Sequence, residues 1–196
     1  MRRLPFLASL LVSIALVTGV SAHAATWVID ENHSSVSFKV RHLFTKVPGG
    51  FLKFAGTVEY DPAKPEAGSV TVSIDAASVN TRQERRDKHL RSADFFDVES
   101  YPMLTFESTK VVKGEGNAFT VEGNLTMRGV TKPVTLAAVY LGSNERTAGF
   151  EATTTVNRKD FDISWNRTLD NGGVVLGDDV EITITIEANV PEKTKS

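Results

Sequence analysis

Apolar and polar residues alternate along much of the chain with a period of two. Five runs show this alternation, at residues 36–40, 70–74, 119–127, 150–156 and 180–186. Antiparallel strands with one buried face and one wet face have this pattern, whereas parallel strands buried on both faces are apolar throughout. The sequence therefore predicts a mainly antiparallel sheet.

Turn-forming residues separate these runs, as at Arg128-Gly129 and at residues 113–117. Further segments near residues 27–29, 51–60, 104–111 and 134–141 bring the number of strands to about eight. Many short strands joined by turns indicate a β-barrel or a β-sandwich. We therefore predict an all-β fold in a single domain.

One stretch departs from the β pattern and predicts a short helix at about residues 82–91. Thr81 is followed three residues later by Glu84, which is the spacing of a capping box. Asp87 and Arg91 are spaced to pair on the helix surface. Three apolar residues are expected to hold the helix on the sheet: Leu90, Phe95 and Phe96.

The N-terminus has the pattern of a secretory signal peptide. Arg2 and Arg3 precede an apolar run at residues 4–20, and Ala22-His23-Ala24 is a small-x-small cleavage site. We expect cleavage after Ala24, a barrel domain over residues 25–191 and a frayed polar tail at 192–196. The predicted location is the periplasm. The chain contains no cysteine, so neither a disulfide nor a lipid anchor on cysteine is expected.

Charge argues against a nucleic-acid partner. The full chain has a formal net charge of −2, and loss of Arg2 and Arg3 with the signal peptide makes it −4. Nucleic-acid-binding proteins usually carry a basic patch or stripe, and no such stripe stands out in this chain.

The alternation does not determine whether the barrel interior is filled by side chains or hollow. An eight-stranded barrel is just wide enough to be filled by its own side chains or to hold one small ligand. A packed core and a lipid pocket both account for the inward Val, Ile, Phe, Leu, Met and Ala residues.

Four sequence blocks resemble the YceI-like family of secreted proteins. They are WVID (27–30) with HSSVSFKVRHL (33–43), SVNT (78–81) with RDKHLRSADFFD (86–97), YP (101–102) with TFES (105–108), and LTMRGVTKPV (125–134). The resemblance implies an extended eight-stranded antiparallel β-barrel of lipocalin-like shape, with an elongated pocket for a polyisoprenoid or a quinone-like lipid. It also implies a homodimer, and transient contact with a membrane or a membrane protein for lipid exchange is a further expectation.

Two departures from known patterns qualify this resemblance. The Gly-x-Trp motif of true lipocalins is missing, since Ala25 stands two residues before Trp27. The family often reads Arg-x-Asp-Phe-Gly near its end, whereas here Asp162 follows Phe161. The missing glycine predicts a change in that turn.

Eleven residues become candidate ligand contacts under this resemblance: Phe38, Val40, His42, Phe51, Phe54, Phe95, Phe106, Leu125, Met127, Phe150 and Trp165. Small inward residues such as Ala138 and Ala152 would leave room for a lipid chain. His42 continues the parity of Val40 and is expected near a barrel mouth, where it could bind a lipid head group. A hydrogen bond from His42 to a backbone carbonyl is the favoured alternative.

Catalysis is not expected. Five residues invite a metal or hydrolase interpretation: His33, His42, Asp87, His89 and Asp94. However, the chain contains neither HExxH nor GxSxG, and Asp87 and His89 would point to different sides of a helix. These helix residues are better explained as charged hydrogen bonds to strand ends. Arg158 and Asp160 are expected to form a weak surface pair.

The sequence thus predicts a non-enzymatic carrier, store or stress-protective binder of an isoprenoid lipid, without metal or cofactor. Two alternatives remain. One is an enzyme that acts on an isoprenoid or quinone lipid, with His42 as its best candidate residue. The other is a structural or stress protein with a filled barrel and an external partner.

Overall fold

The structure, a computed structural model, describes residues 25–168 and 174–191. Its strands are β1 (Ala25–Ile29), β2 (Ser35–His42), β3 (Thr45–Phe51), β4 (Phe54–Tyr60), β5 (Ser69–Asp75), β6 (Val79–Asn80), β7 (Met103–Lys113), β8 (Ala118–Met127), β9 (Val130–Ser143), β10 (Thr147–Asn157) and β11 (Leu176–Asn189). The helix α1 is Glu84–Arg91, and the 3-10 turns are η1 (Glu31–His33), η2 (Pro65–Ala67), η3 (Ala76–Ser78) and η4 (Arg158–Phe161). The predicted signal peptide and polar tail lie outside the described residues.

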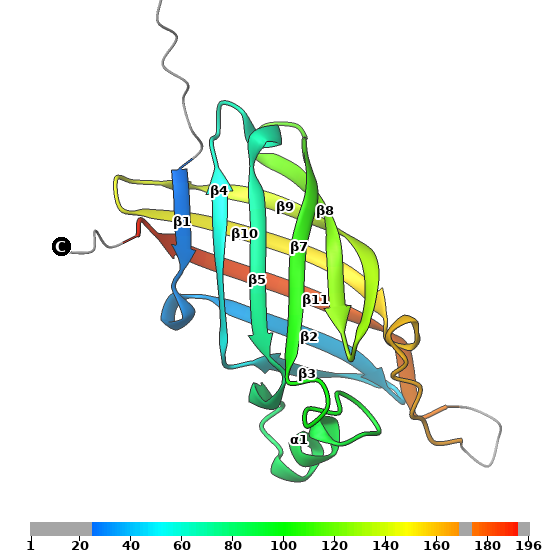
Figure 1. Ribbon diagram of the computed structural model, residues 1–196. Coiled ribbons are helices and arrows are strands. Elements are labelled where there is room, and N and C mark those ends of the chain that lie inside the picture. Colours follow the sequence, from blue (N-terminus) through cyan, green and yellow to red (C-terminus); the bar gives the residue numbers. More distant parts are fainter. Residues whose placement is uncertain (1–24, 169–173, 192–196) are drawn as a thin grey trace, which may run out of the picture.

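The strands close into an eight-stranded antiparallel barrel, as predicted (Figure 1). Hydrogen-bonded neighbours follow the order β1-β4-β5-β7-β8-β9-β10-β11, and β1 pairs with β11 to close the ring. The remaining segments continue ring strands after short breaks: β2 follows β1, β3 precedes β4, and β6 follows β5. They therefore lengthen the barrel wall next to β11 and do not form a separate layer.

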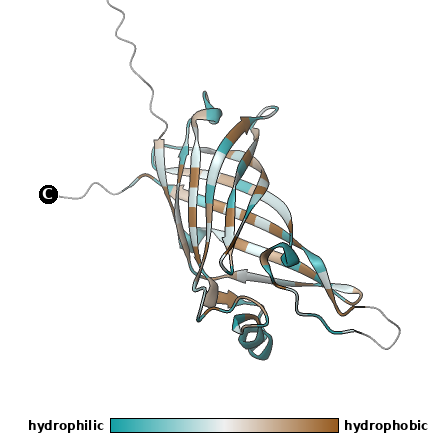
Figure 2. Ribbon diagram, turned by 45° about the vertical axis from the view of Figure 1, so that its right-hand side comes forward, coloured by the Kyte–Doolittle hydropathy of each residue, from teal (hydrophilic) through white to brown (hydrophobic). Residues whose placement is uncertain are grey.

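The period-two runs place their apolar residues inside the barrel. Ile182 on β11 pairs with Phe38 on β2 and with Thr154 on β10, so the inward parity continues from strand to strand. Figure 2 shows apolar and polar positions alternating along the long strands. This register is required because a slip by one residue would turn every apolar side chain outward.

Two glycines allow aromatic rings to lie against a neighbouring strand. A Cβ atom at Gly49 would lie 2.4 Å from Cζ of Phe38, and one at Gly123 would lie 2.4 Å from Cζ of Phe106. Any larger residue would push these rings away, so glycine at these positions fixes where both phenylalanines point.

The helix α1 forms where expected, but its contacts differ from the prediction. It begins at Glu84, and its N-cap is Gln83, whose side chain accepts a hydrogen bond from the Arg86 N–H. Thr81 is not the cap, because its hydroxyl and its N–H both donate to the buried carboxylate of Asp87. The prediction of a Thr81–Glu84 capping box is therefore wrong.

The predicted pairing of Asp87 with Arg91 is wrong as well. Arg91 donates to the carbonyl oxygens of Ala77 and Val79, at 2.7 and 2.9 Å. It thereby ties the helix to the end of the sheet at β6, which agrees with the expected charged hydrogen bonds to strand ends. The structure contains, within its described residues, no helix of the length and hydropathy needed to cross a membrane.

The turn after η4 has Asp162 at the position where the family often has glycine. Asp162 adopts the left-handed conformation, with φ 58° and ψ 20°, and its N–H donates to the Lys159 carbonyl at 3.1 Å. Aspartate tolerates this region better than most residues with a side chain. The turn therefore forms in spite of the substitution.

Candidate functional site

The barrel encloses a cavity of about 750 Å³. This volume lies within the range of roughly 300–1,000 Å³ that is typical of small-molecule sites. Its wall is formed mainly by inward Val, Ile, Leu and Phe residues from strands all around the ring. The lining is therefore suited to an apolar ligand.

The barrel is not filled by its own side chains. Phe38, Val40, Ile182 and Ile184 have inward parity and line the cavity, yet each stays only partly buried. The surface that they leave uncovered faces the cavity. Of the two interiors that the sequence left open, the structure has the hollow one.

Ten of the eleven candidate residues line this cavity: Phe38, Val40, His42, Phe51, Phe95, Phe106, Leu125, Met127, Phe150 and Trp165. Phe54 is the exception. It begins β4, is only 7% exposed and packs in the core, but it is not part of the cavity wall. Both Ala138 and Ala152 line the cavity and face each other across β9 and β10.

An aromatic cluster lies at the end of the cavity away from α1. The ring of Tyr60 lies 5.2 Å from Phe119, 5.0 Å from Tyr140 and 5.3 Å from Phe150, centroid to centroid. Burial raises the pKa of the Tyr60 hydroxyl, and nearby Tyr140 raises it further. Sequence reasoning missed Tyr60, although it shares the parity of Val58 two residues earlier.

Polar side chains gather at the opposite end, around α1. Six lining residues are exposed, and four of them are His42, Gln83, Arg85 and Arg86; the others are Glu59 on β4 and Glu151 on β10. The ring of His42 has no hydrogen bond to any described residue, so the favoured pairing with a backbone carbonyl is not found there. The α1 end therefore combines apolar walls with cationic side chains.

Three rings pack together at this end. His89 makes edge contacts with Phe95 and Trp165, at centroid distances of 5.0 and 4.9 Å. Its Nε2 lies 2.8 Å from a carboxylate oxygen of Asp94. All three rings line the cavity, so the His89–Asp94 bond holds part of its wall.

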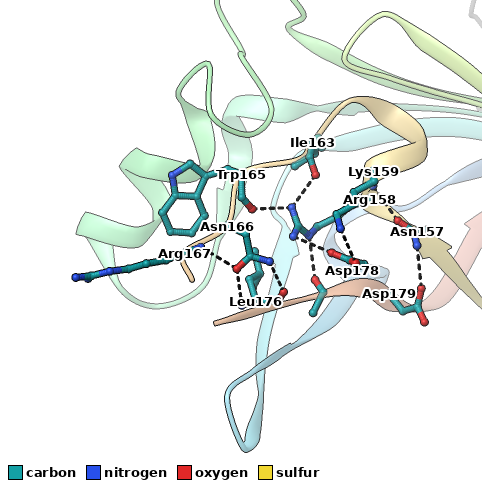
Figure 3. Close-up of polar contacts among 11 residues, drawn as sticks. Asn157, Arg158, Lys159, Ile163, Trp165, Asn166, Arg167, Leu176, Asp178 and Asp179 are labelled. Carbon is teal, nitrogen blue, oxygen red and sulfur yellow. Dashed lines mark hydrogen bonds and ion pairs between the residues drawn. The ribbon is translucent and has the colours of Figure 1, made fainter. Parts of the chain in front are cut away.

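Arg158 is buried, which corrects the prediction of a weak surface pair with Asp160. Its side chain is 4% exposed and donates to the carbonyls of Ile163 and Trp165, at 2.7 and 2.8 Å (Figure 3). It also donates to the Gly177 carbonyl and, at 3.0 Å, to the carboxylate of Asp178. Burial lowers the pKa of the guanidinium, and Asp178 opposes that shift.

This network fixes the segment that carries Trp165. Asn166 adds two bonds to Leu176, because its amide donates to the Leu176 carbonyl and its oxygen accepts from the Leu176 N–H. Residues 163–166 are thereby attached to the start of β11. The role of Arg158 had no recognisable signal in the sequence, since three of its partners are backbone carbonyls, at Ile163, Trp165 and Gly177.

A second polar cluster lies outside the cavity, where β1 and β11 meet. Nδ1 of His33 is 2.9 Å from Oδ2 of Asp30 and 3.9 Å from Oε1 of Glu187. The bond to Asp30 raises the pKa of His33, and the same bond lowers the pKa of Asp30. Asn189 also donates to Asp30, so the cluster links the β1–η1 turn to β11.

The arrangement can hold an elongated apolar molecule with a polar end near α1. Its long axis would extend from the aromatic cluster to the exposed His42, Arg85 and Arg86.

Comparison with known proteins agrees with this architecture. A family profile described as the YceI-like domain matches residues 27–188. A UPF0312 protein of Ectopseudomonas mendocina is 44% identical over 190 residues, which cover 92% of this chain and 95% of that protein.

Solved structures show the same fold. BcnA of Burkholderia cenocepacia is 29% identical with a TM-score of 0.75, and the match covers 82% of this chain and 99% of BcnA. A domain of Saccharophagus degradans described as polyisoprenoid-binding is 15% identical with a TM-score of 0.65, covering 86% and 99%. At that identity the second likeness concerns the fold alone. On the profile match and the close relatives, the chain belongs to the YceI-like family.

Proposed function

We propose that this protein binds a long-chain isoprenoid or quinone-like amphiphilic lipid inside its barrel, and that it carries, stores or scavenges this lipid in the periplasm, including under stress. The observation that carries the proposal is the unfilled apolar cavity of about 750 Å³ with polar side chains at its α1 end. The polyisoprenoid-binding description of the Saccharophagus degradans domain, which shares this fold, is a supporting precedent.

Hydrophobic burial alone is a sufficient driving force. Each CH₂ group removed from water contributes about 0.8 kcal/mol. A lipid tail could therefore bind tightly with few polar contacts, and the apolar wall of the cavity supplies the required surface. The exposed side chain of Arg85 would then contact the head group, beside Arg86, whose guanidinium donates to Thr81.

Sequestration without chemistry accounts for the site better than catalysis does. A nucleophile or general base needs a partner within hydrogen-bond reach. His42, the best candidate for such chemistry, lines the cavity but has no such partner among the described residues. His42→Ala should accordingly leave lipid binding intact, whereas an enzyme that depends on His42 would lose turnover of the bound lipid.

Native mass spectrometry of protein from a periplasmic extract, followed by organic extraction, tests the proposal. We expect a stoichiometric adduct with the mass of an isoprenoid or quinone. A bare polypeptide mass, together with no uptake of added quinone or polyprenol, would overturn the proposal.

Two pairs of variants locate the ligand in the cavity. Phe106→Asp places a charge inside the barrel and should abolish retention, whereas Val112→Asp alters an exposed position of the same strand and should not. Ala152→Phe fills the cavity without adding charge and should displace the lipid. Ala137→Phe enlarges a residue on the outer face of β9 and should leave lipid retention unchanged. Circular dichroism confirms that each variant is folded.

A further inference from the structure

The loop between β2 and β3 exposes a phenylalanine that has no role in the fold. His42 pairs with Thr45, so the loop consists of Leu43 and Phe44 alone. Phe44 is 99% exposed, and Leu43 has a φ of 52°. Two-residue hairpin loops with positive φ favour Gly, Asn and Asp. Leucine at position 43 is therefore unfavourable for folding, and the ring of Phe44 is left in solvent, which points to a role outside the fold.

A second exposed apolar residue lies beside this loop. The Leu43 N–H donates to the Val175 carbonyl at 2.9 Å, and the adjacent Val174 is 52% exposed. Figure 1 shows the β2–β3 hairpin and the start of β11 reaching the same corner of the barrel. We call Leu43, Phe44 and Val174 the apolar tip.

Basic residues surround the apolar tip. Arg41 and Lys46 pair with each other across β2 and β3, just before and after the loop, and both are exposed. The Lys46 ammonium forms an ion pair with Glu181 on β11, so Arg41 is the available cation of the two. Arg167 is exposed too, and its carbonyl accepts from the Val175 N–H at 3.0 Å. An exposed apolar tip bordered by cations is complementary to a bilayer with anionic head groups.

The apolar tip adjoins the α1 end of the cavity. His42 and Val47, on the two strands of the hairpin, line the cavity, and so do Val175 and Leu176 beside Val174. A bilayer in contact with the tip would therefore lie next to the polar end of the cavity.

We propose that the apolar tip inserts into the head-group region of an anionic phospholipid bilayer, with Arg41 and Arg167 against lipid phosphates, and so brings the α1 end of the cavity to the membrane surface. This inference rests on the proposed function for its purpose, which is the exchange of lipid between bilayer and barrel. The docking itself is measurable without reference to the bound lipid.

Flotation of the purified protein with vesicles tests the docking. Vesicles of phosphatidylethanolamine and phosphatidylglycerol at 3:1 are compared with vesicles of phosphatidylcholine, at low and at high salt. We expect binding to the anionic vesicles that weakens with salt. Phe44→Ser should lower the partition coefficient about tenfold, from the burial of one aromatic side chain, and Arg41→Ala about fivefold, from one basic residue.

Leu141→Ser is the matched control. Leu141 is 54% exposed and lies near the end of β9, at the opposite end of the barrel, so its loss should not change vesicle binding. Absence of wild-type binding to anionic vesicles, or equal binding by Phe44→Ser, overturns the proposal. The first outcome would direct attention to a protein partner at the tip.

A transfer measurement separates this proposal from the proposed function. Phe44→Ser should take up a quinone presented in detergent as the wild type does, but should take it up more slowly from anionic vesicles. If the wild type takes up lipid from neither source while still floating with vesicles, the lipid-binding function fails and the docking stands. Equal uptake rates from vesicles would refute the link between docking and exchange.

Discussion

The guanidinium of Arg158 lies 3.0 Å from the carboxylate of Asp178, and the same carboxylate accepts from Lys159 at 2.8 Å on its other oxygen. The two cations differ in burial, since the side chain of Arg158 is 4% exposed and that of Lys159 is 50% exposed. One carboxylate thus receives a buried and an exposed ion pair, which allows the two to be compared directly.

Arg158→Ala should lower the free energy of unfolding by about 3 kcal/mol, because the carbonyls of Gly177, Ile163 and Trp165 lose their donor. Lys159→Ala should cost less than about 1 kcal/mol, as an exposed pair does. Urea denaturation measures both. Equal losses would contradict the structural role assigned to Arg158.

Asp87 anchors the segment before α1, since its carboxylate accepts both the N–H and the hydroxyl of Thr81. Asp87→Ala should cost about 1–3 kcal/mol, because both donors are left buried without a partner. Hydrogen exchange at residues 81–91 should accelerate. Glu84→Ala, at an exposed position of the same helix, should cost under about 1 kcal/mol. Unchanged exchange in Asp87→Ala would contradict the anchoring.

Gly123→Ala tests the close packing of Phe106. The added Cβ would lie 2.4 Å from Cζ of Phe106 and 2.6 Å from the Glu107 carbonyl oxygen, so the ring must move into the cavity. We expect a loss of about 1–3 kcal/mol and weaker lipid retention. At Gly149 the nearest atom outside its chain neighbours is 3.4 Å away, so Gly149→Ala is the tolerated control. Thermal melts of both variants measure the loss of stability, and native mass spectra measure lipid retention.

The Asp30–His33 bond predicts a pH dependence. The bond raises the pKa of His33, so its stabilisation is complete below the ordinary histidine pKa and is lost as the pH rises through the folded value. The same bond lowers the pKa of Asp30, so that contribution is lost when the pH falls below the ordinary aspartate range.

An NMR titration should give His33 a pKa above that of an unperturbed histidine, and Asp30→Asn should return it towards the ordinary value. The thermal midpoint of the wild type should fall slightly between pH 6 and 8, relative to that of the Asp30→Asn protein. If the His33 pKa is the same in the wild type and in Asp30→Asn, the bond is not formed in solution.

Much of the fold could be predicted from the sequence because each inward strand position is encoded locally. The alternation of Val36, Phe38 and Val40 indicates which face of the strand is buried, and the same pattern on the other strands predicts an antiparallel sheet that can close into a barrel. Eight of the ten candidate residues on the cavity wall lie on strands and reached it for that reason, whereas Phe95 and Trp165 lie outside the strands. Phe54 did not reach the wall, because parity gives the face of a strand but not the level along the barrel axis.

Tertiary structure alone decided the remaining features. Whether the barrel is hollow depends on its diameter and on how the side chains of opposite walls meet, which no single strand records. Arg158 looked like a surface charge, yet it satisfies the backbone carbonyls of Ile163, Trp165 and Gly177. The exposure of Phe44 depends on where the β2–β3 loop ends relative to β11. Periodicity encodes the faces of strands, whereas cavities, buried polar networks and exposed tips arise only when distant segments meet.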